Sequence, residues 1–157
     1  MDNKKSFNWI IGILVFVVVG AVSFMVYYEK TSPKVLTKTE YVKEVIVQNK
    51  QFEEVLDNFL DQVFSFNSTK EAADKLENTA AKFPDFVEGL KTKLEPRVPH
   101  ESKEHYKQMM EAYRIYLEAI EMYKNAVLKY SNEERSAAID EAKNKLQEAR
   151  SAMKNIK

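Results

Sequence analysis

The sequence has no cysteine among its 157 residues and only 3 glycines and 4 prolines. The absence of cysteine excludes disulfide bonds, a thiolate nucleophile and cysteine-bound metals. Scarce glycine favours helices over sheets and argues against the glycine-rich loops that bind nucleotide phosphates. Positive charge is not in excess either, because 24 acidic residues balance 24 basic ones. Since proteins that bind nucleic acid usually show a basic surface, we expect no nucleic-acid partner.

One long apolar segment, from Trp9 to Tyr28, contains no charged residue. About 20 residues at about 1.5 Å each span about 30 Å, the thickness of the hydrocarbon core of a bilayer. Aromatic residues stand at both ends of the segment, as is typical of membrane interfaces. The sequence therefore predicts a short tail over residues 1–8 and a single-pass transmembrane helix over residues 9–28, with the lipid bilayer as a partner.

Two other interpretations of this segment stay open. A buried core helix would normally show a polar face, which the segment lacks. Cleavage of a signal peptide near Ala21-Val-Ser23 would require a shorter apolar region. The short basic start at Lys4 and Lys5 is typical of a signal anchor, so we expect the C-terminal domain to be extracytoplasmic. Lysines after the segment, counted alone, favour the opposite orientation.

A polar linker over residues 29–38 precedes four segments in which apolar residues recur at alternating spacings of three and four. The four seams contain Val42, Val45, Asn49, Phe52, Leu56, Phe59, Val63 and Phe66; Ala73, Leu76, Ala80, Phe83, Val87, Leu90 and Leu94; Tyr106, Met109, Tyr113, Tyr116, Ile120, Tyr123, Val127 and Tyr130; and Ile139, Ala142, Leu146, Ala149, Met153 and Ile156. This period is typical of helices that bury one stripe against each other. We predict an all-α protein, with the transmembrane helix followed by an antiparallel three-to-four-helix coiled-coil-like bundle over residues 39–157.

Local signals mark the helix boundaries. Ser68-Thr-Lys-Glu71 and Ser131-Asn-Glu-Glu134 are capping-box patterns that predict the starts of the second and fourth helices. The segment Glu95-Pro-Arg-Val-Pro99 separates the second helix from the third. Because Pro84 disfavours helical geometry in the residue before it, we expect a kink or a restart at Asp85.

The third seam combines tyrosine and methionine in an unusual stripe. Its candidate partner or ligand contacts are Tyr106, Met109, Met110, Tyr113, Tyr116, Ile120 and Tyr123. One interpretation is bundle core, packed large-against-small on the alanines of the fourth seam. The other is an exposed amphipathic groove that binds a helix, a peptide or an apolar ligand.

Asn49 is a polar residue in the otherwise apolar first seam. A single asparagine in such a seam can fix the register and the oligomeric state of paired helices. Asn49 is therefore a candidate for pairing with Asn49 of a second copy in a homodimer. The alternative is a tolerated polar residue near one end of the bundle.

No residue pattern predicts catalysis, a cofactor or a metal. His100 and His105 are five residues apart, whereas a helical zinc motif requires a spacing of four. Adjacent acidic pairs lie among lysines on polar faces, where nothing removes the water that must leave to shift a carboxyl pKa. We therefore expect that the chain is not an enzyme.

The segment Val98-Pro-His-Glu-Ser-Lys-Glu-His105, the tyrosine-rich helix to Tyr116, and the following Ala119 and Ala126 resemble a pattern in known proteins. It is similar to small, uncharacterised, surface-anchored helical-bundle proteins of low-GC Gram-positive bacteria. The resemblance covers roughly residues 98–157 and implies an extracytoplasmic domain, but it implies no activity. This chain differs because it has an apolar span where many of those proteins have a lipidated cysteine.

These observations favour a membrane-anchored interaction or scaffold protein of the cell envelope, in which helix faces bind a protein partner. The alternative function is a carrier or sensor that binds an apolar ligand or a peptide along the tyrosine and methionine seam.

Overall fold

The structure, a computed structural model, describes residues 33–129 and 131–156. A compact unit begins at Val35. Its α-helices are α2 (Lys38–Phe64), α3 (Lys70–Ala80), α4 (Lys82–Leu94), α5 (Lys103–Leu128) and α6 (Asn132–Lys154), and the 3-10 turns η1 (Glu95–Arg97) and η2 (His100–Ser102) join α4 to α5. In the described residues, the prediction of an all-helical bundle is confirmed.

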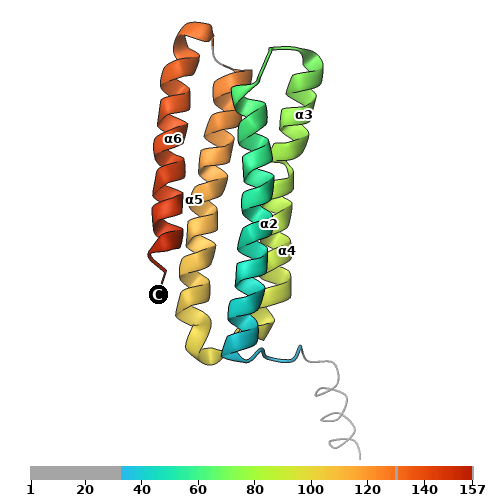
Figure 1. The fold of residues 1–157 in the computed structure, drawn as a ribbon, viewed down its shortest axis with the longest axis vertical. Helices are drawn as coiled ribbons and strands as arrows, with labels where there is room; N and C mark the ends of the chain where they lie inside the picture. Colours follow the sequence, from blue (N-terminus) through green and yellow to red (C-terminus); the bar gives the residue numbers. More distant parts are fainter. Residues whose placement is uncertain (1–32, 130, 157) are drawn as a thin grey trace, which may run out of the picture. The chain divides into compact units, whose positions relative to one another are not determined.

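The helices of this unit alternate in direction (Figure 1). α2 and α5 run one way, whereas α3, α4 and α6 run back. The linker meets the bundle at the start of α2, where the backbone N–H of Leu36 donates to the carbonyl oxygen of Arg97 at 2.8 Å. The entry to α2 and the connection between α4 and α5 therefore lie at the same end of the bundle.

The predicted membrane span, residues 9–28, lies outside the described residues. Within residues 33–129 and 131–156, no helix combines the length and the apolar character needed to cross a bilayer. The transmembrane helix therefore stays a prediction from the sequence.

Capping interactions start the helices, although not all at the predicted residues. Ser131 and Glu134 form the predicted capping box of α6, in which Glu134 Oε2 accepts from the Ser131 hydroxyl at 2.9 Å. Thr37 and Glu40 form a capping box at α2 that the sequence analysis missed. The cap of α3 is Thr69 and not Ser68, because the Thr69 hydroxyl accepts from the N–H of Ala72 at 3.2 Å.

The break in the second helix comes earlier than predicted. α3 ends at Ala80 and α4 begins at Lys82, not at Asp85. The reason is that Pro84 has no N–H to donate to the carbonyl of Ala80, so the hydrogen-bond ladder stops before the proline. Pro84 then lies in the first turn of α4, where an N–H has no helical partner in any case.

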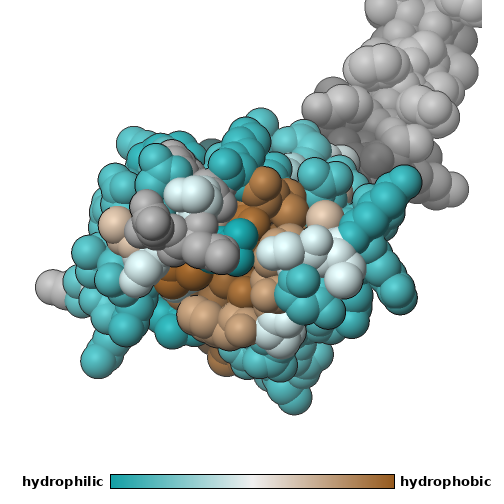
Figure 2. Space-filling model, turned by 90° about the horizontal axis from the view of Figure 1, so that it is seen from above, coloured by the Kyte–Doolittle hydropathy of each residue, from teal (hydrophilic) through white to brown (hydrophobic). Residues whose placement is uncertain are grey.

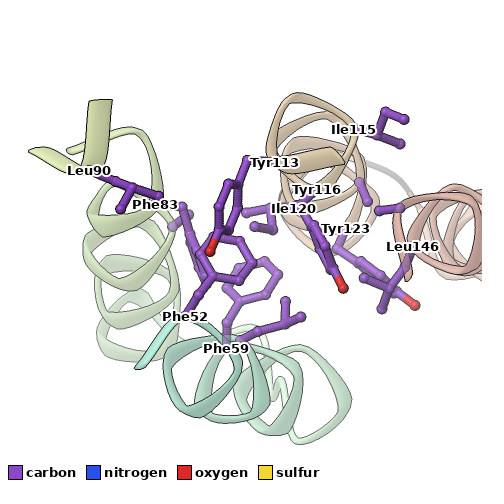
Figure 3. Close-up of a cluster of buried hydrophobic side chains, with 14 of the residues drawn as sticks. Phe52, Phe59, Phe83, Leu90, Tyr113, Ile115, Tyr116, Ile120, Tyr123 and Leu146 are labelled. Atoms are coloured by element: carbon purple, nitrogen blue, oxygen red, sulfur yellow. The ribbon is translucent and has the colours of Figure 1, made fainter. Parts of the chain in front are cut away.

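All four predicted seams contribute to the core. The buried apolar residues of α2 are Tyr41, Val45, Phe52, Leu56, Phe59 and Val63. Val42 was expected in this seam but is 42% exposed, and Tyr41 is buried in its place. Figure 3 shows how Phe52 and Phe59 of α2 meet Phe83 of α4 and the tyrosines of α5.

The packing between α5 and α6 involves buried alanines of both helices, whereas the sequence analysis predicted alanines on the fourth seam alone. The backbones of α5 and α6 approach each other over a longer stretch than those of any other described helix pair. Alanines that are 0% exposed occur on both helices, at positions 112, 119 and 126 of α5 and 142 and 149 of α6. Small side chains on both helices permit such a close approach. Tyr113 and Tyr116 of α5 also pack against the ring of Phe52 on α2.

Polar residues surround the apolar interior in the view along the bundle (Figure 2). At the end where α2 stops and α6 begins, apolar surface is visible between the polar side chains. Phe64, the last residue of α2, is 65% exposed.

Candidate functional site

The predicted tyrosine and methionine stripe divides into two parts in the structure. Met109, Tyr113, Tyr116, Ile120 and Tyr123 are at most 3% exposed and belong to the core. Tyr106 and Met110 are half-buried and lie at the surface between α4 and α5. The structure therefore brings only these two members of the stripe to a surface groove.

The buried tyrosines pack tightly against the aromatic rings of α2. The ring of Phe52 lies 4.8 Å from that of Tyr113 and 5.1 Å from that of Tyr116, measured between centroids. Both contacts are edge-to-face, an arrangement that aromatic pairs prefer. The space beside Tyr113 and Tyr116 is thus occupied by other side chains of the chain itself (Figure 3).

The hydroxyl groups of these tyrosines make hydrogen bonds to polar residues on α2. Tyr113 donates to Oδ1 of Asn49 at 2.5 Å, and Tyr116 donates to Oε1 of Glu53 at 3.1 Å. Burial raises the pKa of both hydroxyls, and the carboxylate of Glu53 raises it further. The two tyrosines therefore stay neutral donors at physiological pH.

Asn49, the predicted register residue, contacts α5 of its own chain. The partner of its side-chain oxygen is Tyr113, 64 residues later in the sequence. Tyr41 and His105 form a second pair with the same separation, with Tyr41 Oη 2.9 Å from His105 Nδ1. Because both pairs have the same offset, they align α2 with α5 in one parallel register.

Tyr106 and Met110 form part of the surface that we call the α4–α5 groove. It has a volume of about 640 Å³, and its lining consists of Lys91, Glu95, Tyr106, Lys107, Met110, Glu111 and Arg114. Burial, together with Glu95 and Glu88, raises the pKa of Tyr106 to about 12. The groove therefore combines an aromatic ring and a flexible thioether with charged groups of both signs.

The charges at the rim of this groove are only partly paired. Glu111 binds Arg114 at 2.6 Å along α5. Lys91 and Lys107 form no ion pair with any residue that the structure describes. Two lysines at the edge of an apolar surface are thus available to acidic groups of another molecule.

A second groove, of about 700 Å³, lies between α5 and α6. Leu117 and Met122 are the apolar residues of its lining. Here the charged residues already bind each other across the two helices, because Lys145 of α6 contacts Glu118 of α5 at 3.1 Å. The α4–α5 groove is therefore the stronger candidate for binding another molecule.

The two histidines differ in their burial and in the elements that hold them. His100 is exposed in η2, whereas His105 is half-buried in the first turn of α5. Burial lowers the pKa of His105. Among residues 33–129 and 131–156, no group of three histidine, aspartate or glutamate side chains is placed to hold a metal ion.

The sequence analysis missed an exposed apolar face on α2. The large apolar residues that are exposed in the described part of the chain are Val35, Val42, Ile46, Val47 and Phe64. All of them lie on α2 or just before it. A signal was present, because Ile46 and Phe64 stand beside the predicted core seam and widen the apolar stripe beyond what one neighbouring helix can cover.

Comparisons with known proteins gave no match to a family model, to a curated protein or to a solved structure. The resemblance to surface-anchored proteins of Gram-positive bacteria therefore stays a prediction.

Proposed function

We propose that the chain is a membrane-anchored interaction protein of the cell envelope, which binds a protein partner in the α4–α5 groove. The apolar segment over residues 9–28 supplies the anchor, and the helical bundle supplies the binding surface. Attachment to a membrane raises the local concentration of the bundle near other membrane proteins, so a modest groove is sufficient.

The observation that carries this proposal is the composition of the groove. Tyrosine and methionine are enriched in protein interfaces because they offer large apolar area with adaptable shape. The unpaired Lys91 and Lys107 stand at its edge. An amphipathic helix of the partner fits this surface, with its apolar side on Tyr106 and Met110 and acidic residues opposite the lysines.

Photo-crosslinking in intact cells of the native host tests the proposal. A photoreactive amino acid in place of Met110 should produce a specific adduct with an envelope protein. The matched control carries the same amino acid in place of Lys143, which is exposed on α6 away from the groove. The same adducts at both positions, or none at position 110, would contradict a partner in this groove.

A second variant separates binding from folding. Met110→Glu places a charge in the groove. It should reduce the amount of the partner protein, identified from the adduct, that co-purifies with the chain by about tenfold, the effect of about 1.4 kcal/mol of lost binding free energy. Lys143→Glu should leave recovery unchanged. Circular dichroism should give equal helix content for both variants.

A further inference from the structure

The exposed apolar residues of α2 lie mainly on one side of the helix. At about 100° per residue, Val42, Ile46, Glu53, Leu60 and Phe64 fall within about 40° of one another. We call this surface the α2 flank. Val42, Ile46 and Phe64 are 42%, 61% and 65% exposed, and Leu60 is half-buried. Apolar residues thus occupy both ends of the flank, with Glu53 at its centre.

α6 reaches the α2 flank at its centre, where Arg150 lies 3.9 Å from Glu53. The backbones of α2 and α6 hardly approach each other. In Figure 3 the two helices lie on different sides of Tyr116 and Tyr123, whose hydroxyl groups point between them. The rings of Phe64 and Tyr123 meet edge-to-face, at 6.2 Å between their centroids. The remaining surface of Phe64 is open to another molecule.

The spacing of the flank is the same in both directions from Glu53. Val42 and Ile46 precede Glu53 by eleven and seven residues, and Phe64 and Leu60 follow it by eleven and seven. A second α2 that runs antiparallel about a two-fold axis at Glu53 therefore places Val42 against Phe64, and Ile46 against Leu60. In such an isologous contact, one patch matches itself on the other subunit.

The charges beside the flank fit the same arrangement. Lys50 lies three residues before Glu53, and Asp57 lies four residues after it, so each Lys50 comes within one residue of the position opposite Asp57 of the other copy. A parallel arrangement would place Lys50 beside Lys50. Lys50 is available, because its contact with Glu54 along α2 is long, at 3.9 Å, and highly exposed.

Glu53 itself does not prevent the contact. Its carboxylate already accepts a hydrogen bond from Tyr116 and lies 3.9 Å from the guanidinium of Arg150. Two Glu53 side chains near the axis therefore each keep a compensating cation. From the repeated spacing and the complementary charges, we infer that two copies of this chain dimerise through antiparallel contact of their α2 flanks. This contact is separate from the α4–α5 groove.

Cysteine crosslinking tests the antiparallel arrangement directly, because the native chain has no cysteine. A mixture of full-length Val42→Cys and full-length Phe64→Cys proteins in mild detergent should form a disulfide between the two variants under mild oxidation. This reaction should be at least about tenfold faster than self-coupling of Val42→Cys. Faster self-coupling of Val42→Cys would show a parallel pair and would overturn the inference.

A surface control and a charge exchange complete the test. Ser136→Cys, on the exposed side of α6, gives the rate of disulfide formation by random collision. Equal rates of disulfide formation at all positions would also overturn the dimer. Lys50→Asp and Asp57→Lys should each lower the dimer fraction in native mass spectrometry severalfold, and the double exchange should restore it. Failure of the double exchange to restore the dimer, or a monomer in the unsubstituted chain at high concentration, would refute the antiparallel contact.

Discussion

Asn49 of α2 accepts a hydrogen bond from Tyr113 of α5 at 2.5 Å, although 64 residues separate them in the sequence. Tyr41 and His105 have the same separation and lie two turns closer to the start of both helices. Polar pairs between otherwise apolar helices favour one register over its neighbours, because a shift leaves each group without a partner. We therefore expect these pairs to specify how α2 and α5 align.

Tyr113→Phe should destabilise the bundle. Removal of the hydroxyl leaves the half-buried Asn49 amide without its partner, at a cost of about 1–3 kcal/mol. Tyr106→Phe is the matched control, because the Tyr106 hydroxyl is buried without a hydrogen-bond partner among the described residues. Urea unfolding of the full chain in mild detergent measures the unfolding free energy of both variants. A smaller loss for Tyr113→Phe than for Tyr106→Phe would contradict the role of the Asn49 pair.

The close contact of α5 and α6 should not tolerate larger side chains. Ala119 is 0% exposed, and Ala119→Leu should cost about 1–3 kcal/mol because the two backbones must move apart. Ala137→Leu, on the exposed side of α6, should change the unfolding free energy by less than about 0.5 kcal/mol. Equal stability of the two variants in thermal unfolding would show that α5 and α6 do not meet through alanine.

His105 should make stability depend on pH. Burial lowers its pKa in the folded state, so the unfolded chain binds a proton more readily. The contribution of neutral His105 to the free energy of unfolding is complete above the pKa of histidine in the unfolded chain, about 6.5. It is lost as the pH falls through the lower pKa of His105 in the folded chain. Unfolding curves at pH 8 and pH 5 should therefore differ less in His105→Gln than in the native chain. His100→Gln is the control and should retain the native difference in unfolding free energy between pH 8 and pH 5. A larger difference in His105→Gln than in the native chain would contradict the expected effect of His105.

Ser68 should be replaceable by glycine with a gain in stability. Its φ of 59° lies in the left-handed region, which costs residues with a Cβ about 1–2 kcal/mol. Ser68→Gly relieves this strain but increases the freedom of the unfolded chain, so a net gain of about 0.5–1 kcal/mol is expected. Ser136→Gly, in the interior of α6, should instead lose about 0.5 kcal/mol. Thermal unfolding that ranks the two variants in the opposite order would contradict the backbone geometry.

The helices and most of the core could be predicted from the sequence because both depend on local periodicity. Leu76, Phe83 and Leu90 of the second seam, for example, are all buried where their spacing placed them. The cap of α6 at Ser131 was also predictable, because a capping box involves only four consecutive residues.

The remaining features depend on contacts between distant segments. Val42 and Tyr41 are adjacent and both apolar, and the burial of Tyr41 depends on His105, 64 residues away. Tyr113 and Tyr116 of α5 contact Phe52 of α2, whereas buried alanines occur on both α5 and α6, whose backbones approach each other closely. The α4–α5 groove depends on the lateral order of the helices, about which periodicity within one helix carries no information.

Membrane attachment is the central claim of this account, and alkaline carbonate extraction of membranes from cells that express the full chain tests it most directly. The native chain should stay in the membrane pellet after high-speed centrifugation. A variant with Val17→Lys and Val18→Glu in the apolar span should move to the supernatant, because charges at the bilayer centre cost about 2.5–3.5 kcal/mol each. Recovery of the native chain in the supernatant would contradict the anchor.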